Sequence, residues 1–221
     1  MKKILIFLSV FIGLVMPVCA KNVMPTHVSS IGANTLGVYQ AGKEMTLYDE
    51  PRVGANIVAH ISWNGDDIFP ENKDFANIFI VYLPKKDLAL LAVVDETEDW
   101  VKVLYDNENG LSGWMKKDDP YKFMSWISFF NIYGRKYGLY MLKDTPKEIK
   151  DLHSSPEDDS QVVSHLNLPP TNASLPHQIK LNVMRGNWAL VSVLDMDRMP
   201  KTGYIRWRSN DGLKYLFPAI K

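Results

Sequence analysis

Short runs of alternating apolar and polar residues recur along most of the chain. Trp100 to Leu104 alternates over its central positions, and Ile179 to Val183 alternates throughout. Because successive side chains of a strand point to opposite faces, this period of two predicts half-buried β-strands. Turn signals such as Asn109-Gly110 and Arg185-Gly186-Asn187 separate the runs. Short strands at this spacing predict an all-β protein built from small barrels or sandwiches.

Two apolar runs in the first half lack this alternation. Phe79 to Tyr82 and Leu88 to Val94 are continuously apolar. A strand has such a sequence when both of its faces are covered. We therefore expect fully buried strands at these two places.

An aromatic-rich segment lies near the middle of the chain. Phe123, Trp126, Phe130 and Tyr133 follow one another at steps of three and four, which places them on one face of a helix. We predict a short helix or loop that packs between two β modules. The alternative is an exposed aromatic stripe that binds a partner, with Trp126 as its candidate contact.

Five blocks of the first half recur in the same order in the second half, which indicates an internal duplication. The separation between the copies varies, as insertions in surface loops allow. The pairs are Leu47–Pro51 with Leu142–Pro146, Ile57–Ile61 with Val162–Leu166, Asp99–Val103 with Asn187–Val193, Gly113–Met115 with Gly203–Ile205, and Asp119–Phe123 with Asp211–Phe217.

The order of these blocks resembles the bacterial SH3-like (SH3b) domain, which has an early leucine strand, a tryptophan-x-lysine-valine strand and a closing glycine-tryptophan-valine. The resemblance implies two tandem SH3-like β-barrels. Two features depart from the family: Tyr48 and Lys143 stand where it has asparagine or arginine, and an insert, Ser62–Ile78, splits the first copy. The implied division is a signal peptide (1–20), an N-terminal segment (21–36), a first module (37–120), an aromatic-rich connector (121–136) and a second module (137–221).

The first 20 residues are typical of a secretory signal peptide. Two lysines precede the apolar run Ile4 to Val15, and short side chains occupy residues 18–20. We expect cleavage after Ala20 and a periplasmic or extracellular mature protein without a cysteine or a membrane span. Two alternatives stay open: an uncleaved N-terminal anchor, and a lipoprotein that carries lipid on Cys19.

Composition and motifs argue against several function classes. A formal net charge of +0 disfavours nucleic acid as a partner. The mature chain has no thiol nucleophile, and the sequence contains no Gly-x-Ser-x-Gly elbow, phosphate-binding loop or His-Glu-x-x-His motif. We therefore expect no metal, no cofactor and no catalysis. The acidic clusters are interpreted as solvated turns, and a serine triad or a catalytic carboxylate pair stays open.

Five side chains merit individual attention. Tyr48 borders the loop that many SH3-like domains use for ligands, and Trp63 lies in a polar stretch of the insert. Both are candidate ligand contacts, together with Trp126. His60 and His165 occupy the same place in the two copies. We interpret them as outward strand residues with local hydrogen bonds, the alternative being paired ligands or pH-sensitive groups.

The resemblance implies a non-catalytic binding or scaffolding protein of the bacterial cell envelope, whose partner is peptidoglycan or an envelope protein. The alternative is a cell-wall hydrolase or its regulator, with a site in the Ser62–Ile78 insert or between the modules. A further reading fuses the two barrels into a rigid unit that dimerises through a strand edge. The sequence leaves the oligomeric state open.

Overall fold

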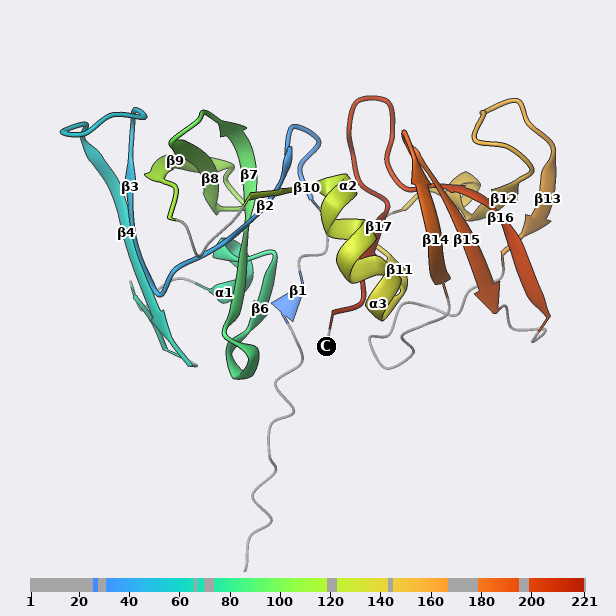
Figure 1. The fold of residues 1–221 in the computed structure, drawn as a ribbon, viewed down its shortest axis with the longest axis horizontal. Coiled ribbons are helices and arrows are strands. Elements are labelled where there is room, and N and C mark those ends of the chain that lie inside the picture. The colour runs from blue at the N-terminus through green and yellow to red at the C-terminus, as the bar shows by residue number, and fades with distance from the viewer. Residues whose placement is uncertain are drawn as a thin grey trace, which may run out of the picture.

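The computed structural model describes residues 26–27, 31–65, 67–69, 74–118, 123–142, 145–166, 179–194 and 199–220. They form two antiparallel β-sheets with a short helical segment between them (Figure 1). The prediction of a mainly β protein is therefore confirmed. No helix among these residues is long and apolar enough to cross a membrane. The expected signal peptide, including Cys19, lies outside the described residues.

The first sheet is built from the first half of the chain and has ten strands among the described residues. A short helix α1 (Phe75–Ile78) and a 3₁₀ turn η1 (Pro84–Lys86) connect some of them. The strands are β1 (Thr26–His27), β2 (Gly37–Gln40), β3 (Glu44–Tyr48), β4 (Ile57–Asn64), β5 (Asp67–Phe69), β6 (Val81–Leu83), β7 (Leu88–Glu96), β8 (Trp100–Asp106), β9 (Leu111–Lys116) and β10 (Phe123–Ser125).

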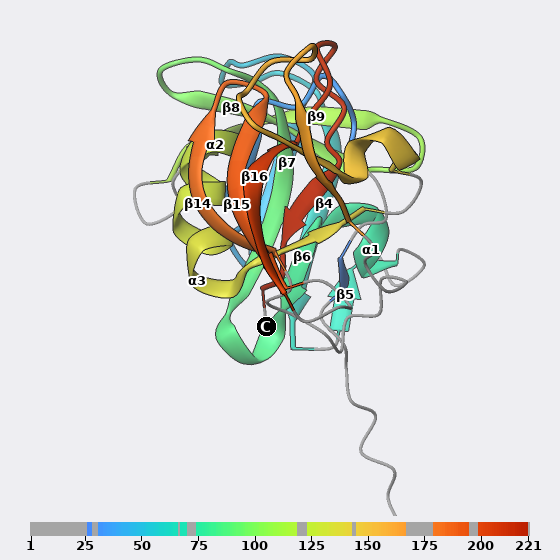
Figure 2. The ribbon, with the colours of Figure 1, turned by 90° about the vertical axis from the view of Figure 1, so that its right-hand side faces the viewer.

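The second sheet has seven strands within the described part of the chain. A 3₁₀ turn η3 (Lys147–Lys150) leads into its second strand. In the turned view of Figure 2, β14, β15 and β16 lie side by side. The strands are β11 (Leu139–Met141), β12 (Asp151–His153), β13 (Val162–His165), β14 (Ile179–Arg185), β15 (Trp188–Leu194), β16 (Pro200–Arg206) and β17 (Leu216–Pro218).

The two sheets share one strand order. In the first sheet, neighbouring strands follow the path β10-β2-β7-β8-β9-β3-β4. In the second sheet the path is β17-β11-β14-β15-β16-β12-β13. Each strand of the second path takes the same place as its counterpart in the first, and β1, β5 and β6 are additions to the first sheet. The repeat noticed in the sequence thus has a counterpart in topology.

Two glycines show how closely the copies correspond. A Cβ atom on Gly113 would lie 2.8 Å from the Leu47 Cβ, and one on Gly203 would lie 2.9 Å from the Leu152 Cβ. The ladder register also shifts after Leu47 and after Leu152. Both pairs of strands therefore contain a β-bulge at the same place.

This correspondence corrects one pair of sequence blocks. The counterpart of Leu47 is Leu152 in β12, whereas the predicted counterpart, Leu142, follows β11. Leu47 and Leu152 are separated by the same number of residues as His60 and His165. Most of the last pair, residues 119–122, lies outside the described residues. The pairing of Leu47 with Leu142 was wrong because it relied on a shared Leu-x-Asp-x-Pro pattern. This pattern is short enough to occur twice by chance.

The aromatic segment forms one continuous helical stretch of three parts: α2 (Trp126–Phe129), the π-helical η2 (Phe130–Gly134) and α3 (Arg135–Tyr137). It lies between the two sheets (Figure 1). Trp126, Phe129 and Phe130 are buried in a core that also contains Leu90 of β7 and Val191 of β15. The stretch therefore packs against both halves, as the core interpretation of the sequence expected.

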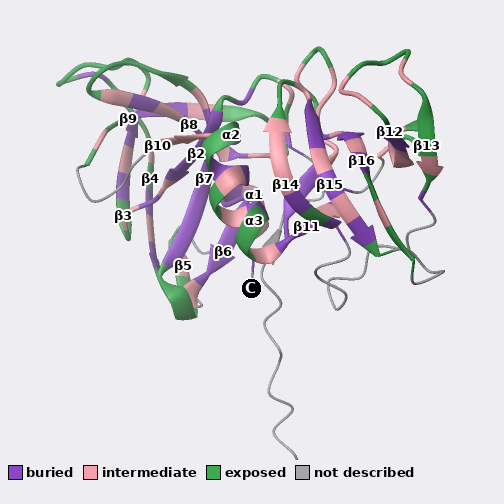
Figure 3. Cartoon of the chain, turned by 45° about the vertical axis from the view of Figure 1, so that its right-hand side comes forward, coloured by how far each residue is buried: buried purple, intermediate pink, exposed green. Residues whose placement is uncertain are grey.

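Strand β7 is covered on both faces, as its unbroken apolar sequence predicted. Leu90 and Ala92 belong to the core shared by the two halves, while Leu91 and Val93 face a second core inside the first half. Figure 3 shows most of β7 as buried. The first half thus packs around two layers of apolar side chains, and β7 separates them.

Candidate functional site

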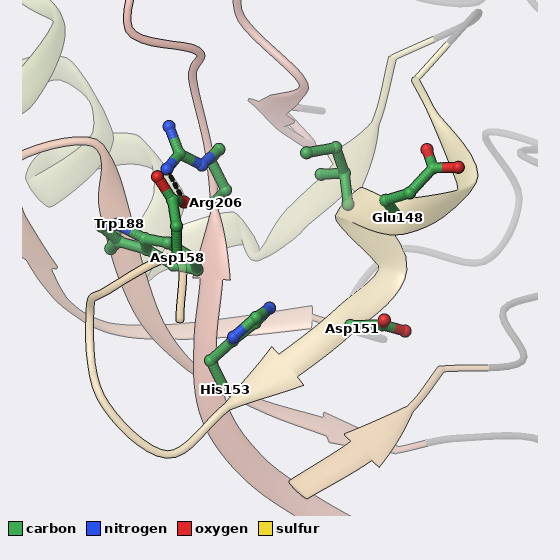
Figure 4. Close-up of a pocket in the computed structure, with 7 residues that line it drawn as sticks. Glu148, Asp151, His153, Asp158, Trp188 and Arg206 are labelled. Carbon is green, nitrogen blue, oxygen red and sulfur yellow. Dashed lines mark hydrogen bonds and ion pairs between the residues drawn. The ribbon is translucent and has the colours of Figure 1, made fainter. Parts of the chain in front are cut away.

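A cavity of about 230 Å³ opens at one edge of the second sheet. Its walls come from η3, from β12 and the loop that follows, and from the adjacent ends of β15 and β16 (Figure 4). Its volume suits one small group rather than a large ligand. The lining residues are Glu148, Ile149, Asp151, His153, Asp158, Trp188 and Arg206.

Local backbone geometry brings these side chains together. Pro146 precedes η3, and its fixed φ favours the tight turn that positions Glu148 and Ile149. Gly186 has a φ of +57°, which lets the β14–β15 hairpin turn directly into Trp188 at the start of β15. Trp188 pairs with Arg206, the last residue of β16. The aromatic and the cationic side chain are therefore adjacent on one face of the sheet.

Arg206 is fixed from several sides. Its guanidinium carbon lies 4.8 Å from the centre of the Trp188 ring. Its Nη2 donates to Asp158 Oδ1, and its Nη1 donates to Asn210 Oδ1 at 3.0 Å. The Arg206 side chain is 14% exposed, so it forms part of a rigid wall instead of extending into solvent. A guanidinium has five N–H donors, which leaves several for a ligand.

His153 lies between this wall and the acidic side of the cavity (Figure 4). Its ring makes an edge contact with Trp188, with 5.0 Å between ring centres. Its Nδ1 lies 3.3 Å from the carbonyl oxygen of Ser160. The Ser160 hydroxyl lies at the same distance from Nδ1, so the two contacts with Ser160 hold the orientation of the ring.

Glu148 and Asp151 form the opposite side of the cavity. Asp151 Oδ1 is 2.7 Å from His165 Nδ1, and the His165 side chain is 81% exposed. In the first sheet, His60 Nδ1 similarly lies 3.2 Å from the Thr46 hydroxyl across the strand pair. Both histidines are outward strand residues with local hydrogen bonds, as the structural interpretation expected.

The seven lining side chains are charged, aromatic or aliphatic. None of these side chains carries a hydroxyl or a thiol, so the lining supplies no serine, threonine or cysteine nucleophile. Among the described residues, no group of three or more His, Cys, Asp or Glu side chains is placed to hold a metal ion. The cavity combines an aromatic side chain with ionisable groups of both charges.

The predicted site residue Tyr48 lies in the first sheet at the place that His153 has in the second. Tyr48 pairs with Trp114 and makes an edge contact with Trp100, with 5.9 Å between ring centres. Its side chain is half-buried at the surface. Ligand contact by Tyr48 stays a prediction.

The other two predicted site residues are in the interior. Trp63 is 4% exposed, and its Nε1 donates to the Gly42 carbonyl at 2.8 Å. Trp126 is 2% exposed, and its Nε1 donates to the Thr35 carbonyl at 2.8 Å. With both indoles enclosed and their polar atoms bonded internally, we leave them out of the candidate site. The insert position of Trp63 suggested a polar turn, but β4 continues through it and turns the indole into the core.

The sequence reasoning missed the charged lining of the cavity. It noticed Trp188 only as a strand residue equivalent to Trp100, and it assigned no role to His153, Asp158 or Arg206. The mistaken Leu142 pairing hid the fact that His153 replaces Tyr48. With Leu152 as the partner of Leu47, the sequence alone would have aligned Tyr48 with His153 and directed attention to this edge.

A comparison of the chain with models of known protein families finds no match. A search of curated proteins finds no similar sequence either.

Proposed function

We propose that this chain is a non-catalytic binding protein of the bacterial cell envelope, that its two halves are SH3-like modules, and that it binds peptidoglycan through the cavity at Trp188. The observation that carries the proposal is the lining of this cavity. An indole wall stands beside Arg206 on one side, and carboxylates stand on the other. The repeated strand order and the signal-peptide pattern in the sequence of residues 1–20 support it.

Peptidoglycan offers the chemistry that this lining can recognise. Its strands carry sugar rings and short peptides with carboxylate and amide groups. Trp188 is 7% exposed and lies beneath Arg206, so it gives the cavity an apolar floor, and the charged side chains around it make the specific contacts. Remaining N–H donors of Arg206 can bond a carboxylate or carbonyl oxygen, and Glu148 can accept from an amide or ammonium group. The chain has a formal net charge of +0, so recognition depends on these local contacts rather than on overall attraction.

Co-sedimentation of residues 21–221 with purified sacculi tests the proposal. We expect saturable binding that persists when the salt concentration is raised, because fixed aromatic and hydrogen-bond contacts are screened less than separated surface charges. Absence of binding at both salt concentrations would contradict peptidoglycan as the ligand and favour an envelope protein as the partner. Clearing of the sacculus suspension would contradict a non-catalytic role.

Two variants and a control locate the binding site. Glu148→Ala removes an exposed carboxylate of the lining, and Trp188→Phe reduces the aromatic wall while keeping an apolar ring. We expect each to weaken sacculus binding several-fold. Glu44→Ala removes an equally exposed carboxylate from β3 of the first sheet and should bind as the wild type does. Equal binding by all three variants would place the site elsewhere.

A further inference from the structure

The first sheet has a surface that corresponds strand by strand to the cavity wall of the second sheet. We call it the Trp100 patch. Trp100 begins β8 as Trp188 begins β15, and Lys116 faces Trp100 across the ladder as Arg206 faces Trp188. The patch consists of Tyr48, Trp100, Lys102, Trp114 and Lys116.

The side chains of the patch share one face of the sheet. Trp114 pairs directly with Tyr48 on one side and with Lys102 on the other. The intervening residues of β8, Val101 and Val103, are fully buried on the opposite face. The patch therefore points away from the inner core. Trp114 is 8% exposed and forms its floor, while Tyr48, Trp100 and the two lysines form its accessible part.

Both surfaces are organised around an edge contact between two rings. Tyr48 meets Trp100 at an interplanar angle of 85°, and His153 meets Trp188 at 66°. In each sheet a basic side chain also lies over an indole. Lys102 Nζ is 5.7 Å from the Trp114 ring centre, and Arg206 lies over Trp188. An aromatic and cationic arrangement thus occurs in both sheets, although Lys102 and Trp114 take the places of Leu190 and Tyr204.

The chemistry of the two surfaces differs in charge. Thr46 occupies the place of Asp151 on the strand pair, and Lys102 occupies the place of Leu190. Asp95 pairs with Lys102 across the ladder, so the patch holds lysines beside one carboxylate. Aromatic rings with lysine donors suit the apolar face and the hydroxyl and N-acetyl oxygens of a sugar ring. The cavity, with groups of both charges, suits a smaller polar group of a peptide.

The two surfaces are also near the same edge of the molecule. The loop between β3 and β4 and the loop between β12 and β13 both lie at the upper edge in Figure 1. The shared core holds the two sheets against each other, so the distance between the surfaces is fixed by packing and not by a flexible linker.

We infer that the Trp100 patch is a second binding site, which holds the glycan part of the peptidoglycan strand whose peptide occupies the cavity. This inference rests on the proposed function and adds bivalent binding to it. Two sites held at a fixed distance convert the second contact into an intramolecular step, which raises apparent affinity for a polymer by a factor of about 10²–10⁴. A fragment too short to reach both sites gains nothing from the second.

The test compares binding to intact sacculi with binding to a soluble fragment of one disaccharide and its peptide. Trp100→Leu and Lys102→Ala alter the patch, and Lys85→Ala is the control. Lys85 is an exposed lysine of η1, between β6 and β7, and lies outside the patch. Thermal denaturation verifies that each variant is folded.

We expect Trp100→Leu and Lys102→Ala to weaken sacculus binding at least about tenfold, while Lys85→Ala binds as the wild type does. Binding of the soluble fragment at the cavity should stay within about twofold of the wild type in all three. Wild-type binding to sacculi by both patch variants, with loss in Glu148→Ala, would overturn the second site and leave the proposed function intact. Absence of binding by the wild-type protein would overturn both.

Discussion

Lys214 joins the beginning of the described chain to its second half. The side chain is 3% exposed, and its Nζ donates to the carbonyl oxygens of Gly32, Ala33 and Thr35 at 3.0–3.1 Å and to the Thr35 hydroxyl at 2.7 Å. The Nζ also lies 5.3 Å from the Trp126 ring centre. An apolar side chain here, such as methionine, would leave several buried acceptors without this donor, which costs about 1–3 kcal/mol for each one left unsatisfied.

The buried amine makes stability depend on pH. Burial lowers the pKa of Lys214 to about 7, and the nearby charge of Arg208 adds to the effect. Between about pH 7 and 10.5 the unfolded chain binds more protons at this group than the folded chain, so the free energy of unfolding rises with pH in that window. Urea denaturation at pH 7 and pH 9.5 should show the wild type gaining up to about 3 kcal/mol relative to Lys214→Met. Parallel changes in both proteins would contradict this assignment.

At the scale of elements, the two close approaches at Gly113 and Gly203 explain why β9 and β16 carry glycine. A Cβ on Gly113 would also lie 2.9 Å from Val58 Cγ2, and one on Gly203 would lie 3.0 Å from the His153 carbonyl oxygen. Both distances are too short for an added methyl group. The paired strands approach each other closely beside the bulge. Glycine permits this approach because it has no side chain.

Alanine at either glycine should destabilise the fold. We expect Gly113→Ala and Gly203→Ala to lower the free energy of unfolding by about 1–3 kcal/mol, the usual cost of forcing extra volume into a packed site. Chemical denaturation followed by tryptophan fluorescence measures the change. Ser112→Ala, on the neighbouring and outward position of β9, serves as the control and should change stability by less than about 0.5 kcal/mol. Equal stability of all three variants would show that the strands relax freely.

At the scale of the whole molecule, one core spans both halves. Phe130 of η2 is fully buried, lies 4.8 Å from the Trp207 ring centre and shares its core with Val38 and Leu90 of the first sheet. The two halves should therefore unfold together in one transition. The helical stretch is a structural part of both halves.

Removing the Phe130 ring tests this coupling. Phe130→Ala should lower the free energy of unfolding by about 3–5 kcal/mol, as deletion of a buried aromatic ring does. Hydrogen exchange should show loss of protection in β7 and in β15 together. Loss confined to the second sheet would show that the halves are independent units. Ile132→Ala, at an exposed position of the same stretch, is the matched control.

The sequence predicted the strands more successfully than the site. Alternation in β8 and β14 and the unbroken apolar run of β7 each follow from which faces are covered, and that information is local. Trp63 was misjudged because its neighbours in the sequence are polar, while its neighbours in space, Phe79 and Tyr82, are aromatic. The local sequence indicates the polar turn that follows Trp63. It does not indicate that the indole packs against aromatic side chains from a different part of the chain.

Sequence alone determined the all-β class, the repeated order of blocks and the helical spacing of the central aromatic residues, because each depends on side-chain periodicity along the chain. Only the tertiary structure decided which strands correspond, since equivalence is a matter of ladder register and close contact at Gly113 and Gly203. The tertiary structure also decided which residues line the cavity. Glu148, His153, Trp188 and Arg206 come from four separate elements, and antiparallel pairing of strands distant in sequence brings them to one edge.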